Sequence, residues 1–340
     1  MLSCRDRTAS GWGEAPYLGE TKSHGESVCS RPTYRSHVHI SPVHEAVANP
    51  PARAAPLTLA DGVDIAGESV RPRAYKNITV VDVAWVKQAQ RALYGGGEYF
   101  ALAAVLAPAA EAAVEVAGIR RGDVVLDVAA GDGNAAIAAA SRGARVVALD
   151  LSPAQVERGR TRSAASGQEI DWVVGDAEEL PFADGTFTHV VSVFGVVFAP
   201  RPEVATAELF RVCTSGGVVA MTAWTEAGYM GELTAFARAA SAVDDPFPDL
   251  DLGWGTKVAM EARLAPHASL VQVEERALPF DPSIRGLAGA EDCAAAYLFQ
   301  HLPADAVAAF ANQRERLAAR HAGTDGIPQA SYLLARAEHR

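Results

Sequence analysis

The sequence predicts an α/β fold built on a largely parallel sheet. After residue 79, short apolar runs rich in valine alternate with segments of helical pattern, as in consecutive βαβ units. The runs are short enough to be strands that are buried on both faces of a sheet. With 340 residues, of which 49% are apolar, the chain can also bury a full hydrophobic core.

Five runs are the predicted strands, and an Ala-rich helix from about Phe100 to Ala117 precedes them. Ser152 at an N-cap position, Pro153 directly after it and Gly167 at the far end delimit a second helix. This helix connects the second and third strands. The predicted strands are Val124–Val128, Arg145–Leu149, Ile170–Val174, Thr188–Phe194 and Val218–Trp224.

The regions on either side of these runs differ in composition. Residues 1–75 are rich in Ser, Arg, Pro, Gly and His and lack periodicity, which predicts a disordered extension. Residues 76–340 are the predicted domain, with a core at about 95–225. Two more strand-like runs, Ser269–Leu278 and Gln329–Ala337, follow it. The segments 226–266 and 281–327 are predicted helical insertions that cap a substrate site.

Charge and cysteine content restrict the expected partners. Thirty basic and 41 acidic side chains give a formal net charge of -11 and a pI near 5.3, so the surface field repels phosphate backbones. We therefore expect no nucleic acid and no membrane as a partner. The four cysteines are scattered singly and nothing marks export, which predicts a cytoplasmic protein without a metal site.

The first predicted strand runs into a turn of small residues. Asp127 lies near the end of the strand, and Gly131 and Gly133 let a ligand approach the backbone without a β-carbon in the way. The helix that follows, Ala135–Ser141, presents amides with partial positive charge to the polar part of a ligand. Because ligands bind at the carboxyl edge of such sheets, the turn predicts a ligand site.

Two more carboxylates follow strand ends at the same edge. Asp150 closes the second strand, where one carboxylate can accept hydrogen bonds from both hydroxyls of a ribose. Asp176 follows the third strand and can accept a hydrogen bond from the exocyclic amine of a purine. Together these positions predict a ligand that contains adenosine.

In order and spacing, these motifs resemble those of class I S-adenosylmethionine-dependent methyltransferases. The resembling segments are Val125–Asn134, Leu149–Ser152, Gly175–Phe182 and Arg211–Gly217. The resemblance covers about residues 95–225. It implies a Rossmann-like α/β fold with a seven-stranded, mostly parallel sheet, helices on both faces, a hairpin of the last two strands and a helical substrate cap. It also implies S-adenosyl-L-methionine as cofactor and a small molecule as methyl acceptor.

The resemblance further implies which residues contact the cofactor. Asp127 and the turn from Ala129 to Gly133 would face its methionine part, Asp150 its ribose, and Asp176 with the amide of Ala177 its adenine. The full set of implied residues is Tyr99, Asp127, Ala129, Ala130, Gly131, Gly133, Asp150, Leu151, Asp176, Ala177 and Phe194.

Three of these positions carry a further expectation. Phe194, at the end of the fourth strand, would line the floor of the site. Tyr99 would either supply a hydroxyl to the carboxylate of the cofactor or anchor the first helix to the sheet. Ala129 stands where many members have glycine, which costs about 1 kcal/mol if that position needs a positive φ and little otherwise.

No residue is identified as a catalytic base. The stretch Val193–Pro200 lies where quinone-pathway members of the superfamily often have two histidines, and it contains no titratable group. Several later residues could contact the acceptor without acting as a base: Trp224, Glu226, Tyr229, Trp254, Tyr297 and His301. The sequence therefore predicts methyl transfer that relies on positioning, to oxygen, nitrogen or carbon of a hydrophobic or specialised metabolite.

Two alternatives stay open at this point. Gly131-x-Gly133-x-x-Ala136 also fits a dinucleotide fingerprint, which would suit an NAD(P)-dependent oxidoreductase. Asp176 has no particular role in such an enzyme, and the later half has no Tyr-x-x-x-Lys pair. The other alternative is a non-catalytic module that binds S-adenosylmethionine, although a large cap favours a substrate pocket. The identity of the acceptor and the oligomeric state, a homo-oligomer included, stay open.

Overall fold

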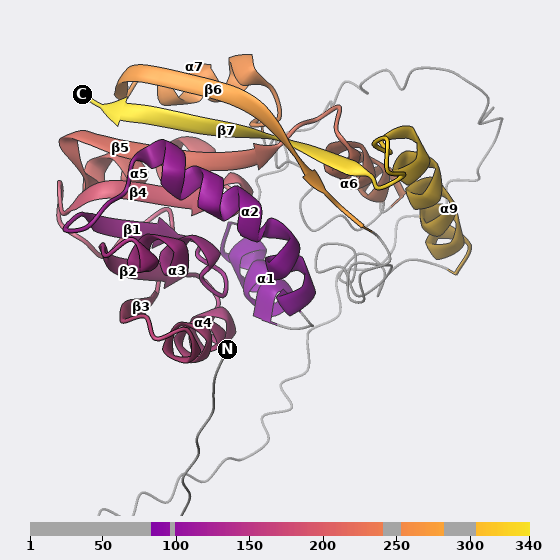
Figure 1. The fold of residues 1–340 in the computed structure, drawn as a ribbon. Coiled ribbons are helices and arrows are strands. Elements are labelled where there is room, and N and C mark those ends of the chain that lie inside the picture. The colour runs from indigo at the N-terminus through magenta and orange to yellow at the C-terminus, as the bar shows by residue number, and fades with distance from the viewer. Residues whose placement is uncertain (1–82, 96–98, 241–252, 282–303) are drawn as a thin grey trace, which may run out of the picture. The chain divides into compact units, whose positions relative to one another are not determined.

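The computed structural model describes residues 83–95, 99–240, 253–281 and 304–340. The predicted extension, residues 1–75, lies outside these ranges. The described part contains a seven-stranded sheet with the order β3-β2-β1-β4-β5-β7-β6 (Figure 1). The strands are β1 (Val124–Val128), β2 (Arg145–Asp150), β3 (Ile170–Val174), β4 (Phe187–Val193), β5 (Cys213–Trp224), β6 (Ala268–Pro279) and β7 (Gln329–His339).

Strand directions confirm the predicted fold class. The strands β1 to β5 pair in parallel, whereas β7 is antiparallel to both of its neighbours, β5 and β6. The predicted strands overlap the observed ones, and the largest difference at a strand start is at β5, which begins at Cys213 instead of Val218. The sheet is thus mostly parallel, and the last two strands form an antiparallel pair.

Helices cover both faces of the sheet (Figure 1). Neighbouring residues of β1 point to opposite faces: Val125 packs in a cluster with the first helix layer and Leu126 in a cluster with the second. The first layer contains α2 (Tyr99–Ala117), α3 (Asn134–Ser141) and α4 (Pro153–Ala165). The second contains α5 (Pro202–Val212) and α7 (Lys257–Leu264). The short 3-10 helix η1 (Val196–Phe198) follows β4.

The predicted cap segment 226–266 contains two helices with different surroundings. The helix α6 (Tyr229–Ala240) packs against α9 (Ala304–Arg320) through a cluster that includes Tyr229, Phe280 and Phe310. In α7, Met260 and Leu264 are four residues apart and are buried in the core beneath the sheet. Residues 257–264 therefore cover a face of the sheet with the side of the helix that carries Met260 and Leu264, whereas Val258 is exposed.

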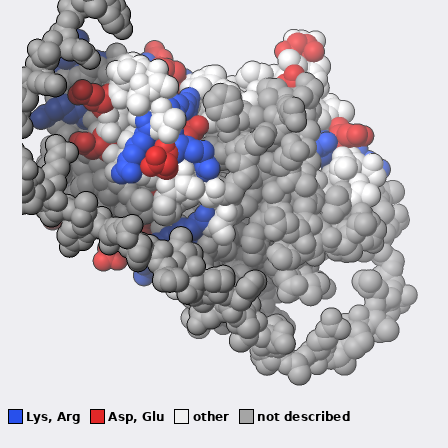
Figure 2. Space-filling model, turned by 90° about the horizontal axis from the view of Figure 1, so that it is seen from below, with Lys and Arg blue, Asp and Glu red and all other residues white. Residues whose placement is uncertain are grey.

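On the face seen in Figure 2, the described basic and acidic side chains are intermixed. Arginines of α4 pair with acidic side chains, as Arg160 does with Glu157 and Arg162 with Asp132. Among the described residues, no helix combines the length and the apolar character that crossing a bilayer requires.

Candidate functional site

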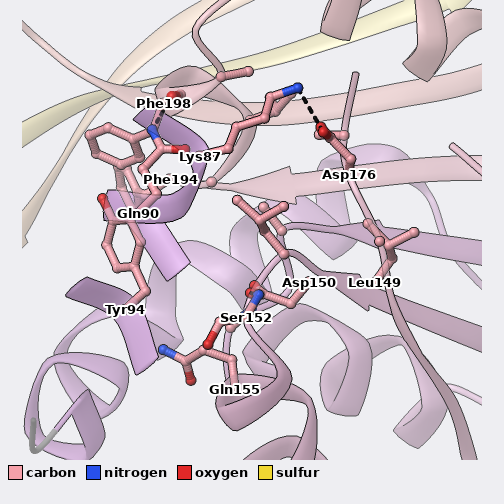
Figure 3. Close-up of a pocket in the computed structure, with 18 of the residues that line it drawn as sticks. Lys87, Gln90, Tyr94, Leu149, Asp150, Ser152, Gln155, Asp176, Phe194 and Phe198 are labelled. Atoms are coloured by element: carbon pink, nitrogen blue, oxygen red, sulfur yellow. Dashed lines mark hydrogen bonds and ion pairs between the residues drawn. The ribbon is translucent and has the colours of Figure 1, made fainter. Parts of the chain in front are cut away.

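A pocket lies at the carboxyl ends of β1 to β4, and helix α1 (Val83–Gly95) also lines it (Figure 3). It holds about 720 Å³ of space free of atoms, its open mouth included. The predicted cofactor residues that line it are Ala129, Gly131, Asp150, Leu151, Asp176, Ala177 and Phe194.

A second, smaller pocket is lined by Asp127 and Ala130, and it shares Ala129 and Phe194 with the larger one. The other two predicted residues, Gly133 and Tyr99, are not seen in the lining of either pocket. The side chain of Tyr99, at the start of α2, lies outside the described residues.

Gly133 instead fixes the path of the turn. Its φ is 95°, and a β-carbon there would lie 2.8 Å from the ring of Trp172. Because side chains rarely adopt this φ and the ring leaves no space, only glycine fits at the start of α3. Gly133 therefore contributes to the site through the geometry of the backbone.

Two residues of the pocket have strained backbones. Ala129 has a φ of 55° and Phe194 a φ of 51°, values that side chains with a β-carbon rarely adopt. Each costs about 1–2 kcal/mol. The sequence left open whether position 129 needs a positive φ. It does, so alanine in place of glycine lowers the stability of the fold.

Asp127 connects the strand to the helix that follows the turn. Its side chain is buried, and its Oδ2 accepts a hydrogen bond of 2.8 Å from the amide of Ala136. Burial raises the pKa of Asp127 to about 8, the hydrogen bond from Ala136 opposes this, and the nearby Asp150 adds to it. The carboxyl group therefore holds a proton near neutral pH until a cation approaches.

Asp150 orders the backbone on both sides of the pocket. Its Oδ2 accepts a hydrogen bond from the amide of Gly131 and its Oδ1 one from the amide of Ser152, both of 2.8 Å. Burial raises the pKa of Asp150, and these hydrogen bonds lower it. Each carboxylate oxygen has a second lone pair and can still accept a hydrogen bond from a ligand hydroxyl.

Ser152 differs from the expected N-cap. It stands at the N-cap position of α4, with Pro153 as the first helical residue, but its hydroxyl makes no capping hydrogen bond. Its Oγ is buried, lines the pocket and has no hydrogen-bond partner among the described residues. The backbone amide of Ser152 donates to the carboxylate of Asp150, and its hydroxyl is available to a ligand in the pocket.

Asp176 makes an ion pair that the sequence did not predict. Its Oδ2 lies 2.6 Å from Nζ of Lys87 (Figure 3). Its Oδ1 accepts a hydrogen bond from the amide of Glu178. Lys87 also pairs with the buried carboxylate of Glu178, at 2.5 Å, which in turn binds Arg201 at the start of α5. Lys87 thereby ties α1 to the strand end that carries Asp176.

Helix α1 was not among the elements predicted from the sequence. Gln90 donates a hydrogen bond of 2.7 Å to the carbonyl of Phe198, and Arg158 of α4 donates to the carbonyl of Tyr94. Lys87, Gln90 and Tyr94 all line the pocket. The spacing of Val83, Val86 and Gln90, three or four residues apart, could have indicated a helix, and Val86 and Gln90 are buried in the structure.

Phe194 separates the pocket from an aromatic cluster. Its ring stacks on Trp224 with centroids 3.9 Å apart, and it meets Tyr332 edge-to-face at 5.5 Å. Its amide donates to Oγ1 of Thr222, which holds the strained backbone in place. Trp224 therefore lies behind Phe194.

Comparisons with known proteins agree with this geometry. A family model described as "Methyltransferase domain" matches residues 126–221. An uncharacterized protein of Mycobacterium tuberculosis is 39% identical over 192 residues, which are 56% of this chain and 70% of that protein. The demethylmenaquinone methyltransferase of Renibacterium salmoninarum is 41% identical over 104 residues, 31% of this chain and 42% of that protein.

The chain belongs to the class I S-adenosylmethionine-dependent methyltransferases. Among solved structures, the YcgJ protein of Bacillus subtilis is 17% identical with a TM-score of 0.49, over 67% of this chain and 96% of that one. The family assignment confirms an enzyme with S-adenosylmethionine as cofactor. The assignment decides against the two alternatives that the sequence had left open, an NAD(P)-dependent oxidoreductase and a non-catalytic module that binds S-adenosylmethionine.

The residues of the methyltransferase pocket fit this cofactor. S-adenosylmethionine combines an apolar adenine face with hydroxyl and amine donors. The pocket offers apolar contacts from Leu149 and Phe198, the acceptors Asp150 and Asp176, and the unpartnered hydroxyl of Ser152. Buried polar atoms without a partner indicate a missing ligand group.

The candidates for acceptor contact lie in other surroundings. Tyr229 is buried between α6 and α9, and Trp254 is buried beneath the guanidinium of Arg263, 4.4 Å from its ring. Tyr297 and His301 lie outside the described residues. Among the described residues that line the methyltransferase pocket there is no histidine, and no metal-binding cluster occurs in the described part of the chain.

Proposed function

We propose that this methyltransferase methylates an oxygen, nitrogen or carbon atom of a small hydrophobic molecule and relies on positioning more than on a base. The observation that carries the proposal is the apolar side of the pocket that follows β4. Its residues, Phe194, Gly195, Val196, Phe198, Ala199 and Pro200, have no titratable group. An apolar surface next to the cofactor favours an apolar acceptor over a charged one.

For the cofactor, we propose that Asp150 binds the ribose hydroxyls and that Asp176 with the amide of Ala177 binds the adenine. Asp127 and the turn from Ala129 to Gly133 face the methionine part. The free lone pairs of Asp150 support its role, because its backbone hydrogen bonds already fix the direction of both oxygens. For Asp176, the ion pair with Lys87 holds the carboxylate at the edge of the pocket.

Leu151 and Phe194 complete the proposed cofactor site with apolar contacts. Phe194 is a rigid surface, because its ring is fixed between Trp224 and Tyr332. A rigid floor restricts where the reacting groups can lie.

S-adenosylmethionine supplies a methyl group that is activated by its bond to a positively charged sulfur. The chain's own residues then have to hold the acceptor close and in line. For well-oriented reactants, orientation alone can supply about 7–11 kcal/mol. The amine of Lys87 is engaged by Asp176 and Glu178, so it is not poised to remove a proton from the acceptor.

We further propose that the enzyme acts in the cytoplasm on a specialised metabolite and not on nucleic acid. The scattered single cysteines support the compartment, and the net charge of -11 opposes binding to phosphate backbones. Residues 76–340 are the proposed catalytic domain, and residues 1–75 an extension of it.

Isothermal titration of the full chain with S-adenosylhomocysteine tests the cofactor site. We expect micromolar binding, a loss of at least about 100-fold in Asp150→Ala and no binding of NADH. Asp171→Ala, an exposed carboxylate on β3, is the matched control and should bind like the wild type. Binding of NADH without binding of S-adenosylhomocysteine would contradict the proposal.

A panel of acceptors then tests the substrate class. Purified enzyme is incubated with radiolabelled S-adenosylmethionine and with apolar and charged compounds that carry hydroxyl, amine or activated carbon nucleophiles. We expect transfer to apolar members. Transfer confined to charged compounds would rule out the apolar acceptor site.

A further inference from the structure

The smaller pocket differs in chemistry from the larger one. It lies between α2 and the turn after β1, and Leu106, Val193 and Phe194 form its apolar part. Its polar side chains are those of Asp127, Asp132 and Asn134, and the described residues that line it include no lysine or arginine. Ala129 and Phe194 line both pockets, so the two are neighbours around the same turn.

Asn134, the first residue of α3, has a fixed orientation in this pocket. Its Nδ2 donates a hydrogen bond of 2.7 Å to the carbonyl of Ala103 in α2. A carbonyl cannot donate, so the amide nitrogen must be the atom that faces it, and Oδ1 points elsewhere. Oδ1 is buried and has no hydrogen-bond partner among the described residues.

Two carboxylates accompany this unpartnered oxygen. Asp127 and Asp132 are 1% and 5% exposed, and burial raises the pKa of each. Arg162 pairs with Oδ1 of Asp132 at 3.0 Å, whereas Asp127 forms no ion pair with a cation among the described residues. The pocket thus collects acceptors of hydrogen bonds and negative charge around a small space, which is the chemistry that binds an ammonium group.

We propose that Oδ1 of Asn134 accepts a hydrogen bond from the α-ammonium group of the cofactor's methionine part, with Asp127 as the nearby counter-charge. This inference rests on the cofactor site proposed above and adds Asn134 to it. The hydrogen bond to Ala103 makes Asn134 specific for a donor, because the nitrogen is already used and only the oxygen is left to pair with a ligand. The ammonium group satisfies the one polar atom of this side chain that the fold leaves unpaired.

Two ligands test the proposal: S-adenosylhomocysteine and its analogue that lacks only the α-amino group. Titration calorimetry of the full chain gives the ratio of their dissociation constants. We expect the wild type to bind the deaminated analogue at least about tenfold more weakly, as for a lost charge-assisted hydrogen bond. In Asn134→Ala, S-adenosylhomocysteine should lose about that factor and the analogue little, so the ratio falls toward one.

Two further variants separate binding from a structural role. Asn134→Asp keeps an acceptor oxygen but loses the donor to Ala103, and it should retain the preference for the amino ligand. Ser141→Ala, at the exposed far end of α3, should behave like the wild type. Thermal melting of each variant verifies that it folds.

Other outcomes would overturn the inference. Equal weakening of both ligands in Asn134→Ala, or loss of the preference in Asn134→Asp as well, would mean that Asn134 acts only by holding α2. Wild-type protein that binds both ligands equally would exclude an ammonium site while the proposed function stands. If the wild type binds neither ligand, the cofactor site itself fails.

Discussion

The cofactor pocket and the α6–α9 region are held together by different kinds of interaction. Around the pocket, Asp127, Asp150 and Asp176 each accept a hydrogen bond from a backbone amide no more than 19 residues away in the chain. Between α6 and α9 the contacts join distant side chains. One is the ion pair of Glu232 with Arg320, 88 residues apart, and another is the aromatic contact of Phe236 with Phe310.

This difference indicates how the two regions can change. In the pocket, local backbone hydrogen bonds orient the three carboxylates, and the ion pairs of Lys87 add a link to α1. The α6–α9 region depends on side chains from several segments, so its packing can change without a change in those backbone hydrogen bonds. Substitutions in one region should therefore leave the other largely unaffected. Phe310→Ala tests this directly, and two variants of the pocket test what stabilises the pocket itself.

The largest expected effect is that of Phe310→Ala in α9. Phe310 is 3% exposed and packs in the cluster with Tyr229 and Leu233. Its truncation should lower the free energy of unfolding by about 3–5 kcal/mol, because it leaves a cavity. The affinity for S-adenosylhomocysteine should stay within about twofold, since separate sites contribute independently. Chemical denaturation and calorimetry measure the two quantities.

Ala309→Ser, at an exposed position of the same helix, is the control for Phe310→Ala and should change neither quantity appreciably. A tenfold loss of cofactor affinity in Phe310→Ala alone would show that the two regions are coupled.

A smaller effect, dependent on pH, is expected for Asp127→Asn. The folded protein holds the proton of Asp127 with a pKa of about 8, against 3.8 as the ordinary value. The folded state therefore binds more protons than the unfolded state between these values, and stability falls as the pH rises through them. Asparagine removes this loss and can still accept from the amide of Ala136. Between pH 6 and 8, the variant should gain roughly 2–3 kcal/mol relative to the wild type.

Melting curves of both proteins across this pH range measure the effect of Asp127→Asn. The exposed Asp171→Asn on β3 serves as the control and should follow the wild type. Parallel pH dependences of Asp127→Asn and the wild type would mean that Asp127 is already ionised in the folded protein.

The sequence could predict those parts of the fold and site that depend on local patterns. The valine-rich runs located the strands, and strand ends in a parallel sheet meet at one edge, which placed Asp150 and Asp176 near a common ligand. The turn after β1 was also recognisable from a local pattern. Gly131 and Gly133 adopt positive φ values there, which favour residues without a β-carbon.

The sequence pattern could not predict contacts between residues that are far apart in the chain. Lys87 reaches Asp176 across 89 residues, and no local pattern records that pairing. The hydroxyl of Ser152 also differed from its expected role, because the residue type at a helix start does not fix whether the hydroxyl turns to the helix amides or to the pocket. The orphaned oxygen of Asn134 similarly depends on the position of α2, which only the folded structure reveals.

The smallest expected effect concerns the strained turn itself. Ala129 adopts a φ of 55°, so Ala129→Gly should relieve strain and raise the free energy of unfolding by up to about 1 kcal/mol. Ala130→Gly, one residue on and without a positive φ, should instead lower it by about 0.5–1 kcal/mol, because glycine gains freedom in the unfolded chain. Opposite signs in denaturant titrations would show that backbone conformation, and not the loss of a methyl group, decides stability in this turn. Destabilisation by both variants would mean that packing of the Ala129 methyl group, against Gly195 for example, outweighs the strain of the turn.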